Sequence, residues 1–178
     1  MDKKWGIIEL VSCTRHDWLN KIQLIKGNIE LGKMDNVKAI IDECIRESKN
    51  EAQLSHCNLQ TVAEWLITSK WLAMPFILEY EVLTAVKGTE YIDRRMHQWL
   101  VEFVEVLSSE LDILDENELR IMIGEIDQSL RFTFELQGKI KRIDIISDFL
   151  NGSMEAERLT VERCNEEELV FHMDWNGQ

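Results

Sequence analysis

Apolar residues near the start of the chain recur at alternating steps of three and four, which is the spacing of one face of an α-helix. This row consists of Ile8, Val11, Trp18, Ile22, Ile25 and Ile29, with Arg15 at its one polar position. The pattern predicts a helix from about Lys3 to Leu31, roughly 43 Å long at ~1.5 Å per residue. Gly32 is then expected to end this helix, and Asp35 to cap a second helix that runs to about Gln53.

The second predicted helix also has a wide apolar face. It is formed by Val37, Ile40, Ile41, Cys44 and Ile45, and Ser48 lies on the same face. A two-helix hairpin cannot bury two faces of this width by itself. We therefore expect two hairpins to pair into a four-helix bundle, which makes the protein a homodimer.

Helical and strand-like patterns alternate after residue 56. Helices are expected over 58–72, with Asn58 as N-cap, over 91–111 and over 143–150. Strands are expected over 76–86 and in two hairpin-like pairs, 118–126 with 129–137 and 158–163 with 169–175. The sequence thus predicts an α+β fold in two domains: a helical hairpin at 1–56 and an antiparallel α/β sandwich at 57–178.

Charge and cysteine content narrow the class of protein. The chain has 178 residues and a net charge of −13, which argues against nucleic acid or an anionic membrane as partner. No stretch approaches the ~20 apolar residues of a membrane span. Glu9 interrupts the short apolar run after Lys3 and Lys4, so we interpret this run as helix and not as a signal segment. The four cysteines are widely spaced, and we expect neither disulfides nor a metal site but a cytoplasmic protein.

His16 is the side chain with the clearest chemical potential. On the first predicted helix it shares a polar stripe with Ser12, Cys13, Asn20, Gln23 and Gly27. An exposed imidazole, with a reference pKa of about 6.5, is largely neutral at cytoplasmic pH and can attack an activated phosphoryl group. On chemistry alone, however, an ordinary surface histidine is the simpler interpretation.

The residues around His16 match a known pattern. His16-Asp17-x-x-Asn20 resembles the phosphoacceptor box of two-component sensor kinases, in which a helix of a dimeric hairpin carries His-Glu/Asp-x-x-Asn/Thr. The longer segment 15–28, RHDWLNKIQLIKGN, is similar to the sporulation initiation phosphotransferase B family of the Bacillus phosphorelay. Residues 78–83, LEYEVL, resemble the start of that family's second domain. Strong similarity is confined to these two segments, while the order of predicted elements fits along the whole chain.

The resemblance implies a specific role. Members of the family take a phosphoryl group onto histidine from the aspartate of one response regulator, a single-domain donor, and pass it to a second regulator, a transcription factor that controls sporulation. His16 matches the acceptor position. Supporting or docking roles are expected for Arg15, Asp17, Asn20, Lys21 and Gln23. No cofactor is expected on this chain, and Mg²⁺ is expected on the response regulator.

The second domain resembles a degenerate form of the ATP-binding domain of a histidine kinase. The intact domain needs an asparagine-bearing helix for Mg²⁺ and glycine-rich loops whose backbone amides hold phosphate. The helix predicted at 91–111 has no asparagine, and no Gly-x-Gly occurs in the chain. We therefore predict a phosphotransferase that does not use ATP. The alternatives are a non-catalytic dimeric module that binds a response regulator and an autophosphorylating kinase.

Overall fold

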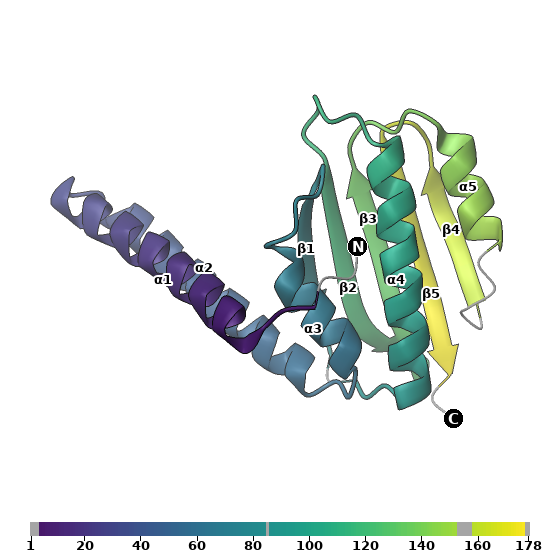
Figure 1. The fold of residues 1–178 in the computed structure, drawn as a ribbon, viewed down its shortest axis with the longest axis horizontal. Coiled ribbons are helices and arrows are strands. Elements are labelled where there is room, and N and C mark those ends of the chain that lie inside the picture. The colour runs from purple at the N-terminus through teal and green to yellow at the C-terminus, as the bar shows by residue number, and fades with distance from the viewer. Residues whose placement is uncertain (1–3, 85, 153–157, 177–178) are drawn as a thin grey trace. The chain divides into compact units, whose positions relative to one another are not determined.

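The computed structural model describes residues 4–84, 86–152 and 158–176. The chain divides into two compact units, Asp2–Ala52 and Gln53–Gln178. The first unit is helical, and the second contains a five-stranded sheet with helices (Figure 1). The two-part α+β fold class expected from the sequence is confirmed. The boundary after residue 56 stays a prediction.

The first unit is an antiparallel pair of helices, α1 (Ile7–Glu30) and α2 (Met34–Ser55). The predicted start near Lys3 was too early, because Gly6 is extended, with φ −80° and ψ 148°, and precedes the first helical turn. Gly32 follows the end of α1, as predicted. Its backbone has the left-handed conformation, at φ 69°, that glycine adopts without steric cost. The prediction of Asp35 as N-cap was wrong, since α2 already begins at Met34 and Asp35 lies in its first turn.

The helical hairpin buries little apolar surface within itself. No residue of α1 is buried, and Val37 of α2 is 5 % exposed. Large apolar side chains that are at least half exposed follow α1 along its length: Ile7, Ile8, Val11, Trp18, Leu19, Ile22, Leu24 and Ile29. A pair of helices with so small a core gains little of the ~25 cal/mol per Å² that apolar burial provides. This distribution fits the expectation that the hairpin is completed by another surface.

The second unit is built from the remaining elements in chain order. They are α3 (Gln60–Ser69), β1 (Ile77–Val82), α4 (Glu90–Glu110), β2 (Glu118–Ile126), β3 (Ser129–Gln137), α5 (Ile143–Gly152), β4 (Arg158–Cys164) and β5 (Glu168–Asn176). The strands lie in the order β1-β2-β3-β5-β4. Both predicted strand pairs, β2 with β3 and β4 with β5, are antiparallel neighbours. The sheet is mixed, however, because β1 pairs with β2 in parallel through the crossover helix α4.

The core of the second unit lies between the sheet and its helices, and α4 and α5 cover the same face of the sheet (Figure 1). Trp99 and Phe103 of α4 stack on each other and meet Phe134 of β3 and Phe171 of β5, with ring centroids 4.6 to 5.8 Å apart. Such spacings are typical of favourable aromatic pairs. Trp99 and Trp65 are both buried.

The cap of α3 differs from the prediction. Asn58 was expected to cap this helix, but its backbone is left-handed at φ 54° and Leu59 is the residue before the first turn. Instead, the carboxylate of Asp93 in α4 accepts hydrogen bonds from the backbone N–H groups of Thr61 and Val62, each at 2.9 Å. An acid at a helix N-terminus satisfies orphan donors and interacts favourably with the helix dipole. This contact fixes α3 against α4.

Candidate functional site

His16 lies in the middle of α1 with its side chain 74 % exposed. Its imidazole is therefore accessible to a macromolecule that docks on the helix. Gln23, two turns later on the same face, is also exposed, and so is Arg15 immediately before the histidine. The exposed polar stripe predicted from the helical spacing is confirmed for His16, Asn20 and Gln23.

The ring of His16 has two neighbours on its own helix. The side-chain nitrogen Nδ2 of Asn20, one turn later, is 3.2 Å from Nδ1 of His16. The carboxylate oxygen Oδ1 of Asp17 is 3.9 Å from the same ring nitrogen. The first distance is that of a long hydrogen bond, whereas the second is an electrostatic contact. Both groups thus act on Nδ1, which leaves Nε2 as the nitrogen on the opposite edge of the ring.

Lys21 lies among the residues with an expected docking role, but its side chain contacts the second helix of the hairpin. Its ammonium group is ion-paired with Glu47 of α2, and its Nζ lies 6.0 Å from the ring centroid of Trp18. Partial burial lowers the pKa of Lys21, but the hydrogen bond and charge of Glu47 outweigh it, and the pKa is raised above the ordinary value of 10.5. Lys21 therefore links the two helices of the hairpin.

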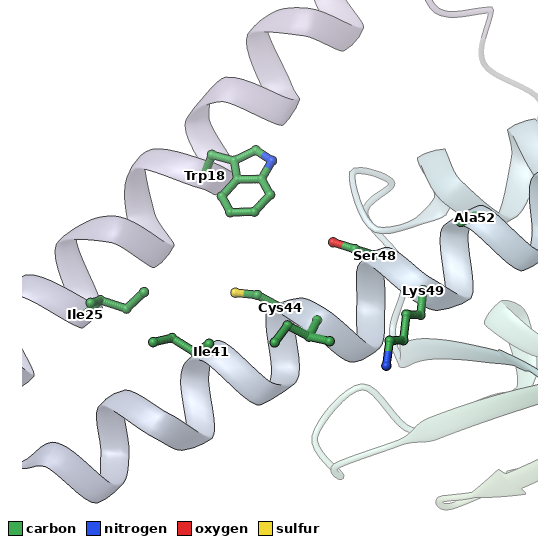
Figure 2. A pocket seen from close by; sticks show the side chains of 8 residues that line it. Trp18, Ile25, Ile41, Cys44, Ser48, Lys49 and Ala52 are labelled. Atoms are coloured by element: carbon green, nitrogen blue, oxygen red, sulfur yellow. The ribbon is translucent and has the colours of Figure 1, made fainter.

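Glu47 was not predicted as a partner of Lys21. The signal lay in the position of the turn: when two helices fold back at Gly32–Met34, residues equidistant from that turn face each other. Lys21 and Glu47 are each 13 positions from Met34. Ile25 and Ile41 are not equidistant from the turn, at 9 and 7 positions from Met34, but Figure 2 shows their side chains pointing toward each other.

A mostly apolar pocket of about 470 Å³ lies between α1 and α2. Figure 2 shows Trp18 of α1 directed toward Cys44 and Ser48 of α2. The pocket is lined by Trp18, Ile25, Ile41, Cys44, Ile45, Ser48, Lys49 and Ala52. Trp18, Ile25, Ile41, Cys44 and Ile45 belong to the two apolar faces from which the four-helix bundle is predicted.

The other histidines belong to other elements of the chain. His97 is part-buried on α4, and His56 follows the end of α2. His172 of β5 has a side chain 12 % exposed, with Nδ1 3.4 Å from Oε1 of Glu162 in the neighbouring strand. Within the described ranges, no three His, Cys, Asp or Glu side chains gather as metal ligands. Nor does any described helix have the length and apolarity needed to cross a bilayer.

The chain thus consists of a helical hairpin followed by a domain with a mixed sheet. The hairpin carries an exposed histidine whose ring contacts the amide of an asparagine side chain. Residues 2–57 match the family model described as the alpha-helical domain of the SpoOB-type sensor kinase. Residues 58–176 match the model described as the C-terminal part of sporulation initiation phospho-transferase B. The chain belongs to the sporulation initiation phosphotransferase B family, as its sequence pattern predicted.

One relative and two solved structures give the degree of similarity. Sporulation initiation phosphotransferase B of Bacillus subtilis (strain 168) is 32 % identical over 117 residues, which are 66 % of this chain and 61 % of the relative. A bacterial phosphotransferase is 14 % identical with a TM-score of 0.41, covering 96 % of this chain and 98 % of that one. The blue-light activated histidine kinase of Erythrobacter litoralis is 10 % identical with a TM-score of 0.49, covering 99 % and 62 %.

Proposed function

We propose that this chain is a relay phosphotransferase in which His16 carries a phosphoryl group between two response regulators. The donor is the aspartyl phosphate of a single-domain regulator, and the acceptor is the aspartate of a transcription factor that controls sporulation. The observation that carries the proposal is the exposed imidazole of His16 on an open polar stripe, with both neighbouring polar groups at Nδ1. Membership of the family and the name of the relative support it.

The chemistry requires little from this chain beyond the imidazole. An aspartyl phosphate is a mixed anhydride, so its phosphorus can be attacked directly by a nitrogen nucleophile. The N–P bond forms as the P–O bond breaks, and the aspartate leaves as a carboxylate. The reverse reaction on a second aspartate completes the relay. Mg²⁺ is expected on the regulator, where it would stabilise the charge on the phosphoryl oxygens.

Dimerisation through the hairpin forms part of the proposal. The exposed apolar side chains of α1 and the pocket between α1 and α2 leave a surface that a second hairpin would cover. The resulting four-helix bundle would carry two His16 sites, one on each protomer. Because His16 lies on the polar stripe and not in the apolar row, pairing of this kind leaves both imidazoles exposed.

The second unit is proposed to support the hairpin without binding ATP. The support is the composition of its sequence: α4 contains no asparagine, and the chain has no Gly-x-Gly from which a phosphate loop could be built. A cytoplasmic location follows from the same proposal, because the response regulators of a phosphorelay act on transcription inside the cell.

A transfer assay tests the function. A purified single-domain response regulator, labelled on its aspartate with ³²P-acetyl phosphate, is mixed with the full chain, and a second regulator is added later. His16→Gln is compared with the wild type, and His56→Gln serves as a matched control at an exposed histidine outside the stripe. A parallel sample receives labelled ATP alone.

We expect acid-labile, base-stable label on the wild type and on His56→Gln, followed by its appearance on the second regulator. His16→Gln should remain unlabelled. Relay by His16→Gln would refute the assignment of the acceptor. Labelling from ATP alone would refute the proposal that the second unit does not use ATP. Binding of the regulator without label on this chain would favour the non-catalytic binding module.

A further inference from the structure

The contact between Asn20 and His16 lies on the exposed surface, where water could form a hydrogen bond with the imidazole in place of Asn20. The histidine side chain is 74 % exposed, and Asn20 is exposed as well. Asparagine is a weaker helix former than leucine or alanine, and this position contributes nothing to a core within the chain. Neither local helix stability nor packing therefore explains an amide at this position. Its distance of 3.2 Å from Nδ1 gives it one specific interaction, with the ring.

The consequence of that interaction depends on which end of the amide meets the ring. A neutral imidazole has one N–H and one lone pair, so a bond at Nδ1 decides the state of Nε2. In the structure the nitrogen Nδ2 of Asn20 lies 3.2 Å from Nδ1. Because an amide NH₂ group can only donate, this orientation requires Nδ1 to accept and the proton to lie on Nε2, which is then unable to attack. Rotation of the amide by half a turn brings its oxygen to the same place. The oxygen accepts a proton held on Nδ1, and Nε2 then has the lone pair.

We propose that Asn20 sets the tautomer of His16, with the amide nitrogen toward Nδ1 in the resting form and the amide oxygen toward Nδ1 in the form that accepts phosphate at Nε2. This inference rests on the proposed phosphotransfer function and assigns Asn20 as a positioning residue for it. Asp17 cannot do the same from its present position, because its carboxylate is 3.9 Å from Nδ1 and has no donor.

The transfer step balances with the proton held at Nδ1. The Nε2 lone pair forms the N–P bond, and the aspartate of the donor regulator leaves with the electrons of the P–O bond. The ring becomes a phosphorylated imidazolium, whose Nδ1–H is bonded to the amide oxygen of Asn20 and lies near the carboxylate of Asp17. In the onward step the N–P electrons return to Nε2, and neutral imidazole leaves with its proton still on Nδ1.

The tautomer can be measured without any phosphate in the sample. The full chain is labelled with ¹⁵N-histidine, and the His16 signals are assigned by their loss in His16→Gln. Spectra are recorded at a pH at which the ring is neutral. Asn20→Asp supplies an acceptor alone, and Asn20→Leu supplies neither group. Asn151→Leu, at an exposed helical asparagine in the second unit, is the matched control for the same change of side chain.

We expect Asn20→Asp to shift the His16 nitrogens toward the Nδ1–H tautomer and Asn20→Leu to shift them toward the tautomer of free imidazole in water. Asn151→Leu should leave them unchanged. Phosphoryl acceptance from the labelled regulator should fall at least about 10-fold in Asn20→Leu, and Asn20→Asp should retain it. Circular dichroism and the affinity for the unphosphorylated regulator should not change in either Asn20 variant.

Three results would overturn the inference. Identical His16 nitrogen shifts in wild type and Asn20→Leu would show that the amide does not set the tautomer. Unchanged transfer despite a changed tautomer would show that the tautomer does not limit the reaction. A fall in transfer explained by weaker regulator binding would make Asn20 a docking residue. Relay by His16→Gln would instead refute the proposed function, while the ¹⁵N spectra would still report on the tautomer.

Discussion

Asp93 lies in the first turn of α4, yet its carboxylate caps α3, and its replacement by alanine tests how strongly this contact stabilises the second unit. The side chain is 5 % exposed, although aspartate in an amphipathic helix is usually solvated. Its two oxygens accept hydrogen bonds from the backbone N–H groups of Thr61 and Val62, which lie 32 and 31 positions earlier in the chain. The substitution leaves both donors without this acceptor.

The expected cost follows from the type of bond lost. A hydrogen bond to a charged acceptor contributes about 1.5–3 kcal/mol. Loss of an N-cap typically costs about 0.5–2 kcal/mol. The two bonds share one carboxylate and are not additive, so we expect Asp93→Ala to lower the free energy of unfolding by about 2–4 kcal/mol. Asp93→Asn keeps one acceptor oxygen but directs an NH₂ group at a helix donor, and its effect should be intermediate.

Urea unfolding of the full chain, followed by tryptophan fluorescence and circular dichroism, measures this loss. With a slope of about 2 kcal/mol per molar urea, the midpoint of the transition that reports on the second unit should fall by about 1–2 M in Asp93→Ala. Glu90→Gln is the matched control, because Glu90 lies in the same turn, is exposed and pairs with Arg94 at the surface. The free energy of unfolding of Glu90→Gln should differ from that of the wild type by no more than about 0.5 kcal/mol. If Asp93→Ala behaved like this control, the remote cap would not be a source of stability.

Two further substitutions test the two units separately. Gly27→Ala should stabilise the hairpin by about 0.5–1 kcal/mol, because glycine is costly inside a helix; a Cβ there would meet no atom within 4 Å. A lower urea midpoint for this variant would contradict the expectation. The pKa of Glu110 is lowered by its hydrogen bond from Arg142, so the stabilisation by Glu110 is complete above its ordinary pKa of 4.5 and is lost as the pH falls through the folded-state value. The gap in urea midpoint between wild type and Glu110→Gln should therefore stay constant above about pH 4.5 and narrow as the pH falls below it, and a constant gap throughout would refute the assignment.

The parts of the fold that sequence predicted well are those determined by local periodicity. The hairpin of β2 and β3 was predicted with its observed bounds, because apolar residues recur at every second position through most of β2 and throughout β3, on both sides of a short turn. At that turn Asp127 and Gln128 both adopt positive φ, as a two-residue hairpin turn requires. The polar stripe around His16 was predicted for the same reason, since all its members lie on one helix.

The parts that sequence did not predict depend on contacts between distant segments. The parallel pairing of β1 with β2 is one such feature, because alternation within a strand carries no information about the direction of its neighbour. The cap of α3 is another: Asn58 had the right residue type for an N-cap, but it lies one residue before the N-cap position, which is Leu59, and the acceptor came from Asp93. Local preference was overridden once α3 and α4 packed together, since a buried carboxylate needs donors as much as a helix N-terminus needs an acceptor.

Contacts between distant segments also change the charge that the sequence suggests around His16. Residues 15–28 contain three cations and one Asp, which suggests a basic surface for a phosphorylated partner. In the structure Lys21 is paired with Glu47, and Lys26 lies 3.8 Å from Glu30. The second pair is exposed on both sides and therefore weak, so a docking partner can separate it at little cost. Lys21 is partly buried, and its separation would also loosen the hairpin. Under the proposed function, Arg15, the neighbour of His16, is thus the cation of this segment that an incoming phosphoryl group would meet, because Lys26 lies ten residues later, about 15 Å further along the helix.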